Sequence, residues 1–474
     1  MWAALLTLVL VFAVFSAGHA MLYKRDPRSA FGWLVTCLAL PIAGTLLYWA
    51  FGVNRIRIRA QRLRRQWPIG EGTAGNSNGP ERFLAQSDHL PKEYRPLIRI
   101  SDAVTRRPLL RGNRVEPLVN GDQAYPAMLE AIGQAQTSVH LSTYIFQNDG
   151  LGKQFVEAFR AARNRGVEVL VLVDWLGEFY SRPRIGREFL DGSVSFARFL
   201  PSSWFHPNLH LNLRNHRKLL VVDGELGFTG GLNIGERYLV HDPAEPRGIR
   251  DLHFRVQGPV VAQMAEAFWE DWTFASDEKS GRELPQPKAS SGDFLCRAVS
   301  AGPNEDFEKL NWILGAAIST AHHRIAIMTP YFVPNRELVG SMRSAALRGV
   351  RVELILPETN NIPPVAWATQ AMLWELVETG VRVFYQPGPF VHTKLFLVDE
   401  HYAQIGSANL DPRSLRLNFE FNLEVYSPAF VEQLLLHFDS VRDASQEMTL
   451  AILDGRPIQT RLRDSFAKLF SPYL

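Results

Sequence analysis

The chain has 474 residues, of which 46% are hydrophobic, so it is long enough for two globular lobes and an appendage. Its two cysteines, Cys37 in an apolar segment and Cys296 in the globular part, imply no disulfide framework, and no Cys/His cluster has metal-ligand spacing. The net charge is +3, but residues 1–66 balance to +8 and the rest of the chain to −5. An acidic globular part argues against nucleic acid as a partner.

Residues 1–53 are predicted to be a membrane anchor with two apolar helices. Residues 2–22 contain no charge and are long enough to cross a bilayer, and residues 31–53 form a second uncharged run that includes Pro41. A signal peptide is the alternative for the first run, because Gly18-His19-Ala20 resembles a cleavage site, although no basic segment precedes it. A hairpin that dips into one leaflet is a further alternative.

Residues 54–116 are predicted to be a basic juxtamembrane segment followed by a flexible linker. Six arginines lie between positions 55 and 65, and residues 66–92 lack apolar periodicity and contain several Gly, Asn and Ser. The positive-inside rule then places the globular part in the cytoplasm, although the short loop between the apolar runs is also basic. The arginines could also hold anionic headgroups.

The remaining chain is predicted to contain two α/β lobes, residues 117–285 and 286–474. Buried strands rich in Val, Ile and Leu alternate with helical patterns in both lobes. In the first lobe we expect strands at 139–146, 167–174 and 252–256 and helices at 152–164 and 260–274. In the second lobe we expect helices at 304–320 and 336–347, strands at 324–329 and 350–356, and an amphipathic helical tail from Phe430, which covers its own core or contacts a membrane.

One motif occurs once in each lobe. The first copy runs from His216-Arg217-Lys218 to Asp223 and on to Gly230-Gly231-Leu232-Asn233, and the second from His392-Thr393-Lys394 to Asp399 and on to Gly406-Ser407-Ala408-Asn409. The spacing is identical, and Arg-Gly-Val precedes both copies. The whole lobe is therefore duplicated, and a pseudo-two-fold axis would bring both histidines to the lobe interface.

These residue types suit a phosphodiester. On a strand, a His and a Lys two residues apart share one face. Lysines and the amides of Asn233 and Asn409 would hold the phosphoryl oxygens, and the small residues Gly230, Gly231, Gly406 and Ser407 would allow the backbone to approach a ligand. One imidazole could attack phosphorus while the other protonates the leaving oxygen. The alternative is two buried strands whose histidines are satisfied core residues.

The paired His-x-Lys-x4-Asp motif resembles that of the phospholipase D superfamily. The resemblance implies a phosphohistidine intermediate, no metal or other cofactor, His216 as nucleophile and His392 as general acid. Because the copies are nearly symmetric, which His attacks stays open. It also implies that Asp223 and Asp399, which belong to the catalytic motif, act structurally at strand ends, and that a carboxylate downstream of each motif orients that motif's His: Asp251 and Glu420.

Most of the chain resembles the bacterial cardiolipin synthases within that superfamily, notably residues 24–52 and Gly406 to Glu420. This likeness implies two phospholipase D-type lobes in a pseudo-two-fold α/β sandwich behind a transmembrane helical hairpin in the bacterial inner membrane. It implies that two phosphatidylglycerol molecules give cardiolipin and glycerol, with phospholipids as partners and no nucleic acid. The alternatives are a hydrolase, a transferase with another donor such as phosphatidylethanolamine, a membrane-anchored nuclease and a non-catalytic scaffold.

Several residues near the motifs have two interpretations. Tyr144 and Phe146 could face the lipid path or pack in the core, and core packing is favoured. Tyr331 could contact substrate or pack. His206 and His210 are interpreted as loop residues ahead of the first motif.

Overall fold

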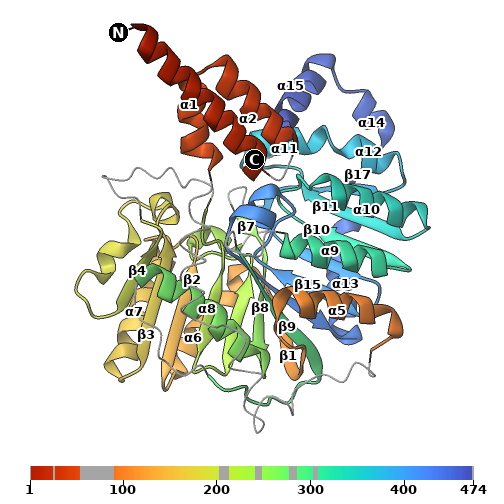
Figure 1. The fold of residues 1–474 in the computed structure, drawn as a ribbon. Helices are drawn as coiled ribbons and strands as arrows, with labels where there is room; N and C mark the ends of the chain where they lie inside the picture. The colour runs from red at the N-terminus through yellow and green to blue at the C-terminus, as the bar shows by residue number, and fades with distance from the viewer. Residues whose placement is uncertain are drawn as a thin grey trace. The chain divides into compact units, whose positions relative to one another are not determined.

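The structure is a computed structural model that describes residues 2–24, 27–53, 90–201, 213–240, 248–276, 285–302 and 308–471. The described residues form two compact units, one within residues 2–53 and a larger one that contains the rest. The larger unit contains both motifs (Figure 1).

The N-terminal unit contains one helix that is long and apolar enough to cross a membrane. This helix, α1 (Trp2–Tyr23), has a mean hydropathy of 2.2 over its most apolar window. The second apolar run was expected to be one helix. It consists instead of α2 (Pro27–Ala39), a break, α3 (Ala43–Leu47) and a π-turn. Pro41 lies in the break, where its missing N–H and its ring prevent the helix from continuing.

Polar contacts join the two apolar runs within this unit. The Trp49 indole donates to the hydroxyl of Ser16 at 2.8 Å, and the His19 ring lies 2.6 Å from the Tyr48 hydroxyl. Both contacts connect α1 with the π-turn, so the broken second run still folds back on the first.

The two lobes of the larger unit have the same order of elements. The first contains β1 (Leu110–Val119), α6 (Asn120–Gln134), β2 (Ser138–Thr143), α7 (Gly150–Asn164), β3 (Glu168–Asp174), β4 (Ser195–Phe199), β5 (Leu219–Val222), β6 (Leu226–Gly230), β8 (Leu252–Gln257) and α8 (Val260–Ser276). The second contains β9 (Phe294–Ala301), α9 (Lys309–Thr320), β10 (Arg324–Met328), α10 (Arg336–Leu347), β11 (Arg351–Pro357), β12 (Arg382–Gln386), β14 (Leu395–Val398), β15 (Tyr402–Gly406), β16 (Glu420–Tyr426) and α13 (Pro428–Asp443).

The strand order confirms the duplication. From β1 outward the order is β8, β6, β5, β2, β3 and β4, and from β9 outward it is β16, β15, β14, β10, β11 and β12. β1 pairs with β9, so the two half-sheets are continuous, and β17 (Gln446–Met448) extends the second half. One hydrophobic cluster joins the inner faces of both halves, with Leu219 and Phe254 from one lobe and Leu395 and Phe421 from the other. The shared core and the β1–β9 pairing make the lobes one compact unit, and Figure 1 shows the two half-sheets side by side.

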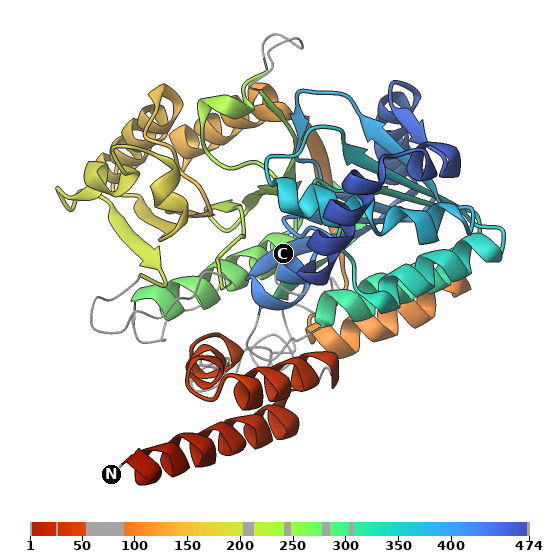
Figure 2. The same ribbon diagram turned by 90° about the horizontal axis from the view of Figure 1, so that it is seen from above.

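The boundary expected at residue 117 falls inside β1, and part of the expected linker is folded. Helix α5 (Arg95–Thr105) begins after Pro91, and its apolar face buries Leu97 and Ile98 against α9 of the second lobe. Figure 2 shows α5, in orange, beside α9. The sequence of α5 has amphipathic spacing, but the low-complexity stretch before it favoured the prediction of a linker. Residues 54–89 lie outside the described part of the chain.

The motif strands lie in the middle of each half-sheet. β5 and β14 are buried throughout and paired on both sides, β5 with β2 and β6 and β14 with β10 and β15. Their Leu, Val and Phe side chains suit strands buried on both faces. The histidine and lysine of each motif lie just before its strand, so the buried strand holds their backbone in place.

The C-terminal region is helical, as predicted. It comprises α13, α14 (Leu450–Asp454) and α15 (Ile458–Leu469), and α15 packs against α11 (Pro363–Gln370) of the same lobe. A two-stranded sheet of β7 (Ile249–Arg250) and β13 (Phe390–Val391) connects the two lobes at the start of the second motif.

Candidate active site

Each motif is anchored by backbone hydrogen bonds to the opposite lobe. The His216 N–H donates to the Phe419 carbonyl at 2.9 Å, and the Phe419 N–H donates to the Arg214 carbonyl at 2.8 Å. The His392 N–H donates to the Arg250 carbonyl at 2.7 Å. Each histidine is therefore joined to the residue just before the other lobe's buried carboxylate.

The carboxylates orient the histidines across the lobe interface. His216 Nδ1 lies 3.0 Å from Glu420 Oε2, and His392 Nδ1 lies 2.9 Å from Asp251 Oδ2. The expectation that each carboxylate serves the His of its own motif was wrong. The backbone pairing just described brings each carboxylate to the other lobe. Because the ionised Glu420 carboxylate only accepts hydrogen bonds, Nδ1 of His216 carries the hydrogen and its Nε2 keeps the lone pair.

Both motif lysines are buried beside the histidines. Lys218 Nζ donates to the His216 carbonyl at 2.7 Å, and Lys394 Nζ lies 3.0 Å from His392 Nδ1. Burial lowers the pKa of Lys218 to about 7 and that of Lys394 to about 8. Both pKa values fall far below the usual 10.5, and a bound phosphodiester anion would favour the charged form of each lysine.

The two histidine–carboxylate pairs differ electrostatically. Burial alone would raise the pKa of Glu420, but His216, Lys218 and the Ser407 hydroxyl lower it below its usual value, so this carboxylate is ionised at neutral pH. Burial raises the pKa of Asp251 to about 7. Burial lowers the pKa of both histidines, and for His392 the charges of Lys394 and Lys218 lower it further. The Asp251–His392 pair therefore takes up a proton near neutral pH.

The small residues after each motif strand make room for protein groups. A Cβ on Gly231 would lie 2.3 Å from both carboxylate oxygens of Asp251. Gly230 and Gly406 have φ of +149° and +146°, and each lies close to the backbone of the neighbouring strand. Ser407 replaces Gly231 in the second copy, and its hydroxyl donates to Glu420. Among the described residues, the orienting carboxylates are thus the groups that lie close to Gly231 and Ser407, and the approach of the backbone to a ligand stays a prediction.

The two motif asparagines use their side chains within their own lobes. Asn233 Oδ1 accepts from the Ile145 N–H at 3.2 Å, and its amide donates to the Tyr238 hydroxyl at 2.7 Å. The Asn409 amide donates to Ser414 at 3.2 Å, and Asn409 Oδ1 has no partner among the described residues. Each amide nitrogen has a second hydrogen.

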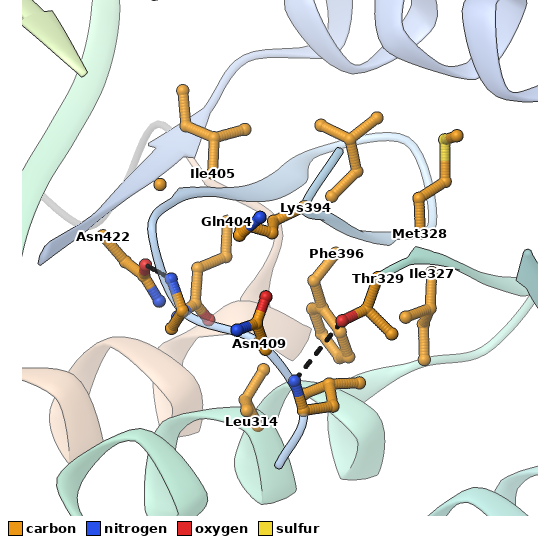
Figure 3. Close-up of a pocket in the computed structure, with 14 residues that line it drawn as sticks. Leu314, Ile327, Met328, Thr329, Lys394, Phe396, Gln404, Ile405, Asn409 and Asn422 are labelled. Atoms are coloured by element: carbon orange, nitrogen blue, oxygen red, sulfur yellow. Dashed lines mark hydrogen bonds between the residues drawn. The ribbon is translucent and has the colours of Figure 1, made fainter. Parts of the chain in front are cut away.

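A cavity of about 30 Å³ lies beside Lys394 in the second lobe (Figure 3). Polar side chains of Thr329, Gln404, Asn409 and Asn422 line it together with apolar residues of β10, β14 and β15. This volume suits one or two water molecules, and Asn409 Oδ1 would supply an acceptor for one of them.

The motif aspartates lie at the far ends of β5 and β14. Asp223 accepts from the backbone N–H groups of residues 136–138, and Asp399 accepts in the same way from residues 322–324. Seven residues of extended chain span about 20 Å, so each lies well away from its histidine. Both belong to the catalytic motif, but this separation does not support a part in the chemistry. They hold the loops before β2 and β10, as the family resemblance implied.

Sequence reasoning missed part of the site wall. The Tyr144 ring meets the His216 ring edge-on at 5.3 Å, because β2 ends at Thr143 and the strand predicted to continue to residue 146 stops before Tyr144. Phe146 is buried in the core. The Tyr331 ring lies 6.1 Å from that of His392. His206 and His210 lie outside the described residues.

Arg217 is a second residue that sequence reasoning missed. Its guanidinium donates to the Glu420 carbonyl at 3.2 Å and pairs with Asp271 at 3.1 Å, while Asn215 donates to the same aspartate. Both residues alternate in direction with His216 along an extended segment, so they point into the lobe interface instead of the site. The alternation of side-chain direction in this segment could have predicted that Asn215 and Arg217 lie at the lobe interface.

Comparisons with known proteins agree with this geometry. The sequence matches the family described as "Cardiolipin synthase, PLD-like domain" over residues 128–272 and 314–442, and one described as "Phospholipase_D-nuclease N-terminal" over residues 4–52. It is 32% identical to a cardiolipin synthase of Oceanobacillus iheyensis, over 99% of this chain and 98% of that one. It is 35% identical to cardiolipin synthase A of Pseudomonas fluorescens, over 97% and 95%.

A crystal structure of phosphatidylserine synthase from Haemophilus influenzae has the same fold, with a TM-score of 0.62 and 18% identity, over 80% of this chain and all of that one. Fold and doubled site together define a phospholipase D-like protein. Within that class, the chain belongs to the cardiolipin synthase family. It is accordingly a phosphatidyltransferase that acts on membrane phospholipids.

Proposed function

We propose that the protein transfers the phosphatidyl group of one phosphatidylglycerol to the glycerol hydroxyl of a second, giving cardiolipin and free glycerol. The single observation that supports this most is the pair of crossed contacts, His216 with Glu420 and His392 with Asp251. They provide two imidazoles with different tasks in one site. Lys218 and Lys394 supply the positive charge for the phosphodiester.

In the first step, His216 Nε2 attacks phosphorus and the bond to the glycerol oxygen breaks. The leaving oxygen takes a proton from His392. We assign attack to His216 because the phosphorylated ring, still carrying its Nδ1 hydrogen, is cationic, and the ionised Glu420 carboxylate stabilises that charge. We assign proton transfer to His392 because its pair with Asp251 holds a proton near neutral pH.

In the second step, the hydroxyl of another phosphatidylglycerol attacks the same phosphorus. His392 accepts the hydroxyl proton, the phosphorus–nitrogen bond breaks, and His216 is restored. One diester replaces another, so the reaction needs no external energy source. Asn233 and Asn409 each have an amide hydrogen left for a phosphoryl oxygen, and we assign them this supporting role.

Water competes with the lipid hydroxyl for the phosphohistidine, and its attack would give phosphatidic acid. Both histidines are largely buried, with 12% and 8% of their side chains exposed. This burial favours transfer over hydrolysis. The membrane anchor also supplies acceptor lipid at high local concentration.

We propose that α1 anchors the enzyme in the bacterial inner membrane, that the broken second apolar run completes the anchor, and that the catalytic unit lies in the cytoplasm. The arginines of positions 55–65, which lie outside the described residues, support this orientation by the positive-inside rule. A protease added to sealed inverted membrane vesicles should degrade the catalytic unit, whereas the same protease outside intact spheroplasts should not.

The reaction is tested with purified protein reconstituted into vesicles that contain phosphatidylglycerol labelled in both acyl chain and headgroup, with a chelator present. We expect labelled cardiolipin and free labelled glycerol in equal amounts. Phosphatidic acid as the main product would make the protein a hydrolase. Turnover only with phosphatidylethanolamine as donor would refute the proposed donor.

A further inference from the structure

Helix α15 carries an exposed apolar stripe. The stripe consists of Ile458, Leu462, Phe466 and Leu469 of the helix and Phe470 at its C-cap, which are 48–72% exposed. At 100° per residue these five lie within one third of the helix circumference. The opposite face carries Asp464 and Ala467, which are buried. The stripe therefore points directly away from the packed side of the helix.

Positive charge flanks the stripe on both sides. Arg461 and Arg463 are about half exposed and lie on opposite edges of the stripe. The single acid of α15, Asp464, is 1% exposed and paired with Arg456 and Arg463. The outer surface of α15 thus combines apolar side chains with basic ones, and the exposed carboxylate beside it, Asp454 of α14, lies 3.9 Å from Arg461.

We propose that α15 lies in the plane of a bilayer surface that contains anionic phospholipid, with the stripe in the boundary between headgroups and acyl chains. A helix with an apolar face, basic edges and no exposed acid has the composition of in-plane membrane helices. Anionic headgroups complement Arg461 and Arg463. A protein partner would have to cover the same stripe.

This surface is connected to one wall of the active site. Arg456 donates to Gln370 at 3.0 Å and Lys468 donates to the Ala371 carbonyl at 3.1 Å, which joins α15 to the end of α11. Just before α11, Asn361 accepts from the Tyr331 hydroxyl at 2.7 Å, and Tyr331 lies beside His392. Docking of α15 would therefore act, through α11 and Tyr331, on the His392 side of the site.

Lipid contact can be measured directly on the full chain reconstituted in vesicles of phosphatidylcholine and phosphatidylglycerol. A fluorescent maleimide is attached to Phe466→Cys, in a His216→Ala background so that the lipid composition stays constant. Both native cysteines are buried and compete little for the label. Leu436→Cys on α13 is the matched control, because Leu436 is 68% exposed but lies outside the stripe.

We expect nitroxide-labelled lipid to quench the probe at position 466 at least about threefold more than the probe at 436, because the stripe lies at the acyl boundary. The excess should fall when phosphatidylglycerol is omitted. Equal quenching at both positions would overturn the proposal. A blue-shifted but unquenched probe at 466 would also overturn it, since another protein surface would then cover the stripe.

Activity gives a second test that rests on the proposed reaction, whereas quenching does not. Leu462→Glu with Phe466→Glu should lower turnover of vesicle phosphatidylglycerol about tenfold and leave turnover of monomeric short-chain phosphatidylglycerol unchanged. Leu436→Glu should change neither rate. Equal loss on both substrates would contradict docking, because the substitutions would then act on the site itself.

Discussion

Glu420 Oε2 lies 3.0 Å from Nδ1 of His216, although the two residues belong to different lobes and are 204 positions apart. The mirror contact joins Asp251 to His392 across 141 positions. Each catalytic imidazole is thus held by the lobe that does not carry it. Neither lobe alone contains a complete histidine–carboxylate pair, which gives a physical reason for keeping both copies in one rigid body.

Removal of the Glu420 charge should disable the nucleophile. In Glu420→Gln the amide cannot stabilise the cationic phosphohistidine, so we expect kcat to fall on the order of a hundredfold or more. Glu424→Gln is the matched control, because Glu424 is equally buried on β16 but contacts Ser101 and Tyr402. Steady-state turnover per folded molecule distinguishes them. Equal losses in the two variants would indicate that burial of any carboxylate on β16 matters, and would contradict the assignment.

The room that Gly231 leaves for Asp251 is a further test. A methyl group there would displace the carboxylate from His392, so Gly231→Ala should lower kcat about a hundredfold, since a shift of about 1 Å is enough for such a loss. Gly133→Ala on α6 has no heavy atom within 4 Å of the new Cβ and should leave activity unchanged. Full activity of Gly231→Ala would show that Asp251 need not touch His392.

The motif aspartates should affect stability and not chemistry. Asp223→Asn and Asp399→Asn keep the side-chain shape but weaken charge-assisted bonds to three backbone N–H groups, so the free energy of unfolding should fall by about 1–3 kcal/mol. Thermal unfolding in detergent measures this loss. The folded fraction should keep kcat within about threefold of the parent protein. A loss of kcat at unchanged unfolding temperature would return these residues to the catalytic group.

The pKa values of the two motif lysines predict the direction in which activity changes with pH. Below pH 7 both Lys218 and Lys394 are charged, and as pH rises through their pKa values of about 7 and 8 they lose the protons that hold the phosphodiester. The Asp251–His392 pair loses its proton over the same range. We therefore expect kcat/KM to decline between pH 7 and 8, and kcat, measured with substrate bound, to decline at higher pH. A kcat/KM that is flat to pH 9 would contradict this electrostatic account.

The duplication explains why so much of the site could be predicted. A repeated His-x-Lys segment ahead of a buried strand identifies the chemistry, and the repeat itself implies a two-fold arrangement with both histidines at the interface. The strands and helices around the motifs followed from apolar periodicity, as with α7 and α10.

Contacts between the lobes could not be predicted in the same way. The sequence near Asp251 does not show whether this residue pairs with His216 or with His392. The choice depends on the backbone hydrogen bond between Arg250 and His392. Tyr144 was assigned to the core because the strand was expected to continue to Phe146. Helix α5 was missed because its amphipathic spacing follows a low-complexity stretch and its packing partner, α9, lies more than 200 positions further along the chain.

The most direct test of the crossed site is to locate the covalent intermediate. Phosphatidylglycerol labelled at phosphorus is mixed with the enzyme, the reaction is stopped within milliseconds by denaturation at alkaline pH, and the labelled peptide is identified by mass spectrometry. We predict label on His216, none in His216→Ala, and a strongly reduced amount in Glu420→Gln. Label on His392, or an unchanged amount in Glu420→Gln, would contradict the assignment of His216 as the nucleophile that Glu420 stabilises from the opposite lobe.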